Sequence, residues 1–537
     1  MTERRLWLST TAAVALLATG LVATEPAADE ATVRHVLNRI TFGATSQAVN
    51  LVLRTGLDQY VDEQLHPERL PLAAMADRLR PFETLQLSSR TIAERYERPL
   101  LEDRARQTRA GTAPQAPPTD NTPRTPTRVQ QQANLPLMEL ASQKILRATY
   151  SDAQLEEVLV DFWFNHFNVD ARKGPTRFML TEYEREAIRP HVLGRFRDLL
   201  GATAHSPAML FYLDNWQSAD PNGPHLDRTA LQGGPARGGR RVQRRGAGQQ
   251  PRRALPNGQP APQRQRPTGL NENYGRELLE LHTLGVDGGY TQKDVTEVAR
   301  AFTGWTIELP RAGGGFRFAP ALHDDGEKVV LGHRIKAGGG ESDGNAVLDI
   351  VAAHPSTARF LSTKLARRFV GDAPPPALVA RMADTFERSH GDLRAVMTTL
   401  LTSNEFREAS ADAVKVKTPF EFVVSALRVT GADVQDARPV VRAVQQLGMP
   451  LYQCQPPTGY VDRADSWVNT GALVSRMNTA LLLADNRMPG VRVTAPDDAL
   501  TLLGGDVSET TRTTIAKAQT PAQAVALALG SPEFQKR

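Results

Sequence analysis

The chain has 537 residues, of which 40% are hydrophobic and 23% are charged, and its net charge is +5. This length and content exclude a marginal small scaffold and allow two to four domains of about 100–200 residues each. A single cysteine, Cys454, excludes an internal disulfide framework. The basic excess is local: residues 226–267 hold ten arginines and one acid, and the rest of the chain is slightly acidic.

The N-terminal residues 1–28 have the pattern of a secretory signal peptide. Arg4 and Arg5 give a positive start, and residues 6–23 form an uncharged apolar run followed by small residues. The paired arginines leave the Sec and the twin-arginine export routes both open. An uncleaved anchor is the alternative, because the run just reaches spanning length. We expect an exported protein, periplasmic, at the cell surface or secreted, with no transmembrane span after signal removal.

Two stretches without aromatic residues interrupt the folded pattern. Residues 103–133 are rich in Pro, Thr and Arg, and residues 220–268 are rich in Arg, Gly and Pro. Such segments cannot offset their ordering entropy by burial, so we predict a disordered linker and a disordered insertion. They leave an N-terminal helical segment, 29–102, and a helical core in two parts, 134–219 and 269–537.

The arginine-rich insertion, 220–268, predicts contact with a polyanion or an anionic surface through its charge density. A solvated tether is the alternative interpretation. Because the insertion has no aromatic side chain for base stacking, specific nucleic-acid recognition is not expected.

Apolar spacing elsewhere is mainly helical and predicts an all-α body. The pattern is clear in three runs: Leu155, Val158, Leu159, Phe162 and Phe167; Val295, Val298, Ala299 and Phe302; and Phe360, Leu361, Leu365 and Phe369. Near 305–335, two short β-favouring pieces, 316–318 and 328–331, are separated by glycine-containing breaks. We therefore predict a small β-hairpin lying on the helices.

Several motifs are spread from about residue 31 to the C-terminus. They include Arg34-His35-Val36-Leu37-Asn38-Arg39, Phe162-Trp163-Phe164-Asn165-His166-Phe167, Tyr212-Leu213-Asp214-Asn215, the long run 271–291, and Ser466-Trp467-Val468-Asn469-Thr470. Together they resemble the bacterial family catalogued as domain of unknown function 1800. The resemblance implies an exported protein without a settled activity, whose partner is another exported protein of sulfatase or phosphatase type. Two features depart from the family pattern: the size of the arginine-rich insertion, and Gly459-Tyr460 in place of the commoner Gly-Trp pair.

The first candidate site residue is His166, which lies among aromatic residues at the end of a predicted helix. Asp161 and Asn165 share one face of that helix, and His166 is displaced from it by about 100°. A histidine in such surroundings is a candidate metal ligand or general base. The alternative is a buried histidine whose hydrogen bonds are satisfied by the backbone.

The second candidate is the helix that carries Glu277, Glu280 and His282. The two glutamates are three residues apart and project from one face, whereas His282 points about 200° away from Glu280. This spacing fits neither a His-Glu-x-x-His zinc helix nor a Glu-x-x-His di-iron helix. The alternative is an ion-paired helix face that includes Arg276.

A divalent metal site would require these side chains to meet others across the fold. The candidate ligands are His166, Glu277, Glu280, His282, His323, Asp324 and Asp287. Asp287 enters this set because residues 287–294 resemble half of a calcium-binding loop, although its opening positions lack carboxylates. The alternative for that loop is a turn in which Thr291 and Asp294 form a capping box for the next helix.

Signatures of nucleophilic catalysis are missing from the sequence. It has no Gly-x-Ser-x-Gly motif, phosphate loop or dinucleotide fingerprint, and Ser206 before Pro207 is interpreted as a helix N-cap. We therefore expect a periplasmic or cell-surface binding or assembly factor that acts with another exported protein. The alternative is a metal-dependent hydrolase that uses the candidate residues as ligands or as acid and base.

Overall fold

The computed structural model describes eight stretches of the chain. They are residues 28–110, 126–223, 269–309, 312–408, 414–494, 496, 498–504 and 507–537. The expected signal peptide, except for Ala28, lies outside the described residues. The same holds for residues 111–125 of the predicted linker and 224–268 of the predicted insertion.

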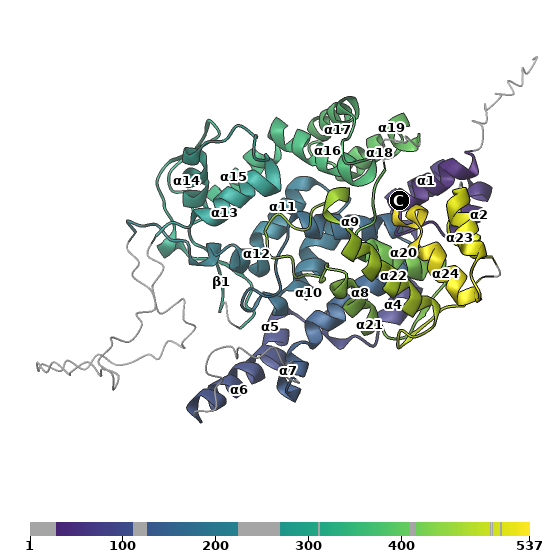
Figure 1. The fold of residues 1–537 in the computed structure, drawn as a ribbon. Coiled ribbons are helices and arrows are strands. Elements are labelled where there is room, and N and C mark those ends of the chain that lie inside the picture. Colours follow the sequence, from purple (N-terminus) through teal and green to yellow (C-terminus); the bar gives the residue numbers. More distant parts are fainter. Residues whose placement is uncertain are drawn as a thin grey trace, which may run out of the picture.

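Helices build most of the described chain (Figure 1). The first half contains α1 (Glu30–Ile40), α2 (Ser46–Thr55), α3 (Leu57–Leu65), α4 (Ala73–Leu79), α5 (Ser89–Ile92), α6 (Arg98–Arg109), α7 (Arg128–Ala133), α8 (Leu135–Tyr150), α9 (Gln154–His166), α10 (Leu180–Glu182), α11 (Phe196–His205) and α12 (Pro207–Tyr212). The second half contains α13 (Glu272–Glu277), α14 (Gln292–Ala301), α15 (Glu341–Ala352), α16 (Pro355–Phe369), α17 (Pro376–Arg388), α18 (Leu393–Leu401), α19 (Asn404–Arg407), α20 (Pro419–Val429), α21 (Arg438–Gln446), α22 (Thr470–Ala484), α23 (Glu509–Ala516), α24 (Pro521–Gly530) and α25 (Pro532–Gln535). This confirms the predicted, mainly all-α fold.

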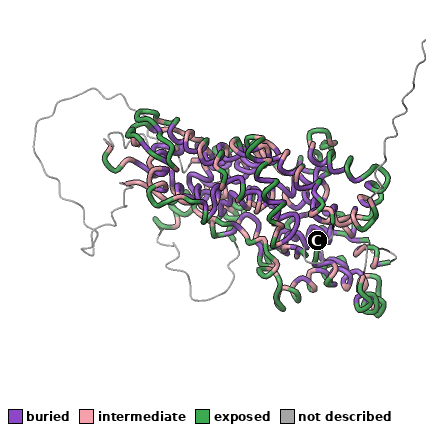
Figure 2. Tube along the Cα trace, turned by 90° about the horizontal axis from the view of Figure 1, so that it is seen from above, coloured by how far each residue is buried: buried purple, intermediate pink, exposed green. Residues whose placement is uncertain are grey.

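The core is continuous along the body, and buried segments fill its interior in Figure 2. Helix α9 lies at the centre, because its sequence is apolar on nearly every face: Leu155, Val158, Leu159 and Trp163 are all at most 1% exposed. Helices α3 and α8 pack beside it. No helix in the described stretches is long and apolar enough to cross a membrane.

The predicted β region contains two small antiparallel sheets, not one hairpin. Strand β1 (Trp305–Ile307) pairs with β2 (Phe316–Phe318), and β3 (Lys328–Val330) pairs with β4 (His333–Ile335). Each of the two β-favouring pieces thus has its own partner. A third pair, β5 (Asp433–Val434) with β6 (Val491–Arg492), joins distant segments that are too short for a sequence pattern to indicate.

The predicted disordered linker, 103–133, is wrong at both ends, where the chain is helical. Helix α6 continues to Arg109, and α7 begins at Arg128 after a capping box formed by Thr127 and Gln130. Leu100 of α6 and Ala133 of α7 are buried in a small apolar cluster with Ile92 and Phe178. These few apolar side chains stabilise helices whose own composition does not favour burial.

Within the described residues, three segments are π-helical: Ala93–Glu97, Tyr183–Ile188 and Leu278–Thr283, the last labelled η9. A π-helix places its hydrogen bonds between residues i and i+5, so side-chain spacing differs from that of an α-helix. Because η9 contains Glu280 and His282, the α-helical angles expected for these residues do not apply within it.

Candidate functional site

His166, the last residue of α9, is buried and fully hydrogen-bonded. Its Nε2 lies 3.1 Å from the carbonyl oxygen of His282, and its Nδ1 lies 2.9 Å from Nζ of Lys364. A carbonyl only accepts, so Nε2 carries the proton and Nδ1 accepts from the lysine. Burial, and then the charge of Lys364, hold the pKa of His166 well below its ordinary value. The imidazole is therefore neutral.

His282 reaches the same place from η9. The two imidazole rings lie 6.2 Å apart, and the ring of His282 also packs against Phe167. Burial first, and then Lys364, lower the pKa of His282 to about 3. Its Nε2 has no hydrogen-bond partner among the described residues. The carbonyl of His282, and not its ring, is what binds His166.

The two candidate glutamates lie in a different environment. Glu280 accepts a hydrogen bond from the hydroxyl of Tyr290 at 3.2 Å. Burial, and then the charge of Glu280, raise the pKa of half-buried Glu277. Neighbouring Arg276 lies 3.8 Å from Glu272 and donates to Gln292. Neither glutamate shares a hydrogen bond with the His166 and Lys364 pair.

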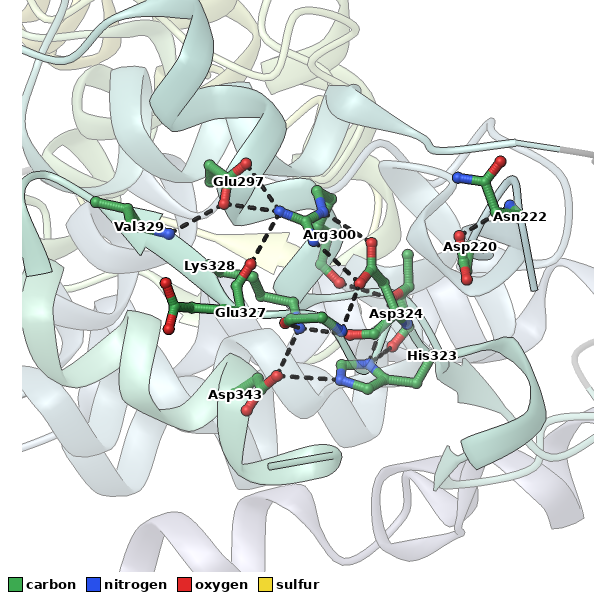
Figure 3. Close-up of polar contacts among 12 residues, drawn as sticks. Asp220, Asn222, Glu297, Arg300, His323, Asp324, Glu327, Lys328, Val329 and Asp343 are labelled. Atoms are coloured by element: carbon green, nitrogen blue, oxygen red, sulfur yellow. Dashed lines mark hydrogen bonds and ion pairs between the residues drawn. The ribbon is translucent and has the colours of Figure 1, made fainter. Parts of the chain in front are cut away.

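His323 belongs to a separate buried network, drawn in Figure 3, which we name the Asp343 network after its central carboxylate. Asp343 lies 2.7 Å from Nζ of Lys328 and 3.2 Å from Nε2 of His323. The Nδ1 atom of His323 lies 2.8 Å from the carbonyl oxygen of Thr303. The three residues of the network are at most 5% exposed, so it is sealed from solvent.

Asp324 and Asp287 lie in an ion pair and on an exposed turn, respectively, and not in a shared site. Asp324 receives the guanidinium of Arg300 at 2.7 Å, and this pairing is visible beside the Asp343 network in Figure 3. Asp287 is exposed on its turn. Thr291 and Asp294 form the expected capping box at the start of α14, which supports the turn interpretation of residues 287–294. Among the residues that the structure describes, no three His, Cys, Asp or Glu side chains are grouped as a metal site.

A cavity of about 230 Å³ adjoins the His166 and Lys364 pair. Helices α8, α9 and α16 and the loop 449–463 form its walls. Its charged lining consists of Lys144, Lys364, Arg367, Arg368 and Arg463 against Asp161 and Asp462. We call this cavity the basic pocket.

Both acids of the basic pocket are already neutralised by lysines. Asp161 lies 2.6 Å from Nζ of Lys144, and Asp462 lies 2.8 Å from Nζ of Lys415, a residue that is 1% exposed. Arg463 pairs with Asp465 at 3.4 Å. The cations of α16 are therefore left facing the cavity without a pocket carboxylate of their own.

Two of these α16 cations are incompletely satisfied. Arg368 is 6% exposed and pairs with Glu421 through Nη2 at 2.8 Å, but its buried Nη1 has no hydrogen-bond partner in the described stretches. Lys364 pairs with no carboxylate among the described residues and donates to neutral His166. Burial, and then the charge of Arg367, lower the pKa of Lys364 to about 8, while Asp462 opposes them.

A family model described as a protein of unknown function (DUF1800) matches residues 35–536. The chain belongs to this family. The match confirms the resemblance that the motifs indicated, and it spans all the walls of the basic pocket. No match to a curated protein or to a solved structure was found.

Gly459 and Tyr460 shape one wall of the pocket. Gly459 has a φ of 73°, and a Cβ there would approach the carbonyl oxygen of Asn165 to 2.2 Å, so only glycine fits. The Asn165 side chain donates to the carbonyl of Tyr460 and accepts from its N–H, at 2.8 and 2.7 Å. Tyr460 then lines the pocket.

Cys454 also lines the pocket of this DUF1800 protein. Burial, and then the charge of Asp170, raise the pKa of its thiol to about 11. The thiol is therefore protonated at neutral pH.

Sequence reasoning missed the basic residues of α16 in this DUF1800 protein. The apolar residues of α16 predict the helix, but Lys364, Arg367 and Arg368 are not among the candidate site residues that the sequence indicates. Their i, i+3 and i+4 spacing places them on one side of the helix, and that was the available signal. Spacing alone does not distinguish a solvated face from a face that lines a cavity.

Proposed function

We propose that this DUF1800 protein is an exported binding protein whose basic pocket takes up an oxyanion of its ligand. The observation that carries the proposal is the buried Nη1 of Arg368, which has no hydrogen-bond partner among the described residues, beside a lysine that has no carboxylate. Leaving a buried donor without an acceptor costs about 1–3 kcal/mol, and more when the donor is charged. A phosphate, sulfate or carboxylate supplies both the charge and the acceptors that the pocket lacks.

The size of the pocket supports recognition of a small group. Whole ligands occupy sites of roughly 300–1,000 Å³, whereas the basic pocket measures about 230 Å³. Aromatic walls provided by Phe162, Phe164 and Tyr460 surround the cations. We infer that the pocket takes up one charged end of a ligand.

Binding is favoured over metal-dependent hydrolysis by the arrangement of the candidate residues. His166 and His282 come together, but Glu280 accepts a hydrogen bond from Tyr290 instead. No hydrogen bond joins Glu277 to the two histidines in the described residues, and His323 belongs to the Asp343 network. The lone pair of His166 Nδ1 already accepts from Lys364. These contacts do not assemble the three or four donors that a zinc site uses.

Export and partnership are part of the proposal and rest on the sequence. The pattern of residues 1–28 supports passage through the inner membrane, and the family resemblance supports an exported partner of sulfatase or phosphatase type. Fractionation of cells that produce the full chain tests the first point. Envelope pull-down tests the second, and recovery without a stable partner would count against it.

Anion binding is tested by thermal unfolding of the purified protein in increasing phosphate or sulfate, at constant ionic strength set with chloride. A ligand at 100 times its Kd stabilises the folded state by about 2.7 kcal/mol, so the midpoint should rise with anion concentration. Lys364→Met and Arg367→Gln should lose most of this rise. Arg381→Gln removes an arginine that is half-exposed on α17 and pairs with Glu405, so it should keep the rise. Equal stabilisation of the wild type and both pocket variants would refute the proposal.

A further inference from the structure

We propose that Lys364 is a covalent attachment point, whose amine condenses with the carbonyl group of a small aldehyde or ketone that also carries an oxyanion. This inference rests on the proposed anion binding, because the arginines of the basic pocket would hold the charged end of the ligand. It adds to that proposal a bond to a named atom, Nζ of Lys364.

The surroundings of the two pocket lysines single out Lys364. Lys144 is held in an ion pair with Asp161 at 2.6 Å. Lys364 has a neutral imidazole as its hydrogen-bond partner, and Arg367 next to it disfavours a further positive charge. A lysine that is desolvated and placed beside another cation has more of its amine in the neutral, nucleophilic form. Since its pKa is lowered to about 8 from 10.5, Lys364 is partly neutral at physiological pH.

His166 is placed to handle the proton of this step. Its Nε2–H is engaged by the carbonyl oxygen of His282, so the tautomer is fixed and the lone pair of Nδ1 faces Nζ of Lys364 at 2.9 Å. This lone pair can take a proton from the attacking nitrogen and return it to the departing oxygen.

The reaction balances without an oxidant or a reductant. The nitrogen of Lys364 attacks the carbonyl carbon, a C–N bond forms, and the carbonyl oxygen becomes a hydroxyl. The C–O bond then breaks, water leaves and an imine remains. Arg367 and Arg368 follow Lys364 by three and four residues on α16, a spacing at which helical side chains are neighbours. They are thus placed to hold the anionic end of the same molecule.

Pyruvate and lactate provide a matched pair of probes, because both are small carboxylates and pyruvate alone has a ketone. The full protein is incubated with each compound, treated with borohydride, digested and mapped by mass spectrometry. We expect pyruvate to modify Lys364 at least ten times more than Lys144 or exposed Lys293, and lactate to modify none of them. Excess phosphate should suppress labelling of Lys364 and leave Lys293 unaffected.

Lys364→Arg keeps the positive charge and removes the primary amine. This variant should still be stabilised by phosphate but should show no labelling in the pocket. Labelling of wild-type Lys364 no higher than that of Lys293 would overturn the inference, and the competition with phosphate holds even if the variant fails to fold. Stabilisation by phosphate without labelling would leave the proposed anion binding intact. Absence of both would remove the two proposals together.

Discussion

Two buried groups of charges in this molecule differ in how completely they are satisfied. In the Asp343 network, Nζ of Lys328 donates to Asp343 and to the carbonyls of Asp324 and Gly326, so all three of its N–H groups are used. In the basic pocket, Nη1 of Arg368 has no partner in the described part of the chain, and Lys364 lacks a carboxylate.

Under the proposed anion binding, this difference separates charges that stabilise the fold from charges that bind a ligand. A buried ion pair with complete hydrogen bonding needs nothing further, and breaking it is costly. Buried cations that lack carboxylate partners beside a cavity lower the stability of the ligand-free protein. Such a loss of stability is typical of binding and catalytic sites. Perturbing each group should therefore have opposite effects on stability.

The largest effect is expected for Asp343→Asn, which leaves Lys328 as a buried charge without a counter-ion. Removing one partner of a buried pair costs about 3–5 kcal/mol, and urea unfolding followed by circular dichroism should show a loss of this size. Asp349→Asn on the same helix is the matched control, because that carboxylate is 66% exposed and should change stability by less than about 0.5 kcal/mol. Similar losses in both variants would mean that the network is not specially stabilising.

Acid should destabilise the protein through His166 and His282. Their pKa values are lowered in the folded state, to about 3 for His282, so the unfolded chain binds protons that the folded chain does not. This contribution to stability is fully present above pH 6.5 and declines as the pH falls towards 3. The decline reaches about 1.4 kcal/mol per pH unit for each histidine. From pH 6.5 to 5, each histidine therefore accounts for a loss of roughly 2 kcal/mol.

His282→Asn removes one of these titrating groups and keeps the carbonyl that binds His166. Unfolding free energies measured across pH 5–7 should give a shallower slope for this variant than for the wild type. An unchanged slope would show that His282 is accessible to protons in the folded protein.

Lys364→Met should stabilise the protein while it removes most of the anion binding. The pKa of Lys364 is lowered to about 8, so below that pH the folded state holds a charge that burial disfavours. We expect a net gain of about 1–2 kcal/mol at pH 7, after loss of the hydrogen bond to His166. The gain should disappear above pH 10.5, where the lysine is neutral in both states.

Lys293→Met is the control for Lys364→Met, because Lys293 is exposed at the start of α14. Its stability should stay within about 0.5 kcal/mol of the wild type at every pH. If Lys364→Met were destabilising at pH 7, the lysine would belong with the satisfied charges of the Asp343 network.

The smallest effect is expected at the N-terminal cap of α14, whose polar groups are hydrogen-bonded, as they are in the Asp343 network. Asp294 receives the backbone N–H of Thr291 and also that of Leu331 beside strand β3. Thr291→Ala should cost about 1 kcal/mol in unfolding experiments, and Thr291→Ser should restore most of it. Equal loss in both variants would point to the methyl group of Thr291 instead of its hydroxyl.

Local patterns allowed much of the fold to be predicted. The apolar periodicity of α9, α14 and α16 indicated these helices, and the capping residues Ser206 and Thr291 lie at helix starts as expected. The ends of the predicted linker were misjudged because Leu100, which helps to bury them, precedes the linker, and Ala133 alone cannot dominate the composition of residues 103–133. The burial of these two side chains in one small apolar cluster is enough to keep those ends helical.

The candidate site was only half predictable, because its contacts connect distant parts of the chain. His166 was identified from its aromatic surroundings, but its partner Lys364 lies 198 residues away. The carbonyl of His282 binds His166, and a backbone acceptor leaves no mark in the sequence. Composition also does not show which charged side chains form ion pairs. The excess of cations without carboxylate partners in the basic pocket could therefore be found only from the structure.

The π-helical turn in η9 makes the pocket sensitive to chain length. A π turn contains about one residue more than an α turn, so deleting one residue from Leu278–Thr283 should let the segment relax to an α-helix. Losing the extra residue in this way would keep the flanking segments in register, but it would shift the backbone groups inside the turn to new positions. The carbonyl of His282 would then leave Nε2 of His166, and the imidazole could exchange its tautomer. Deleting a single residue of η9 would thus change which nitrogen of His166 carries the proton, without changing any of the side chains that line the pocket.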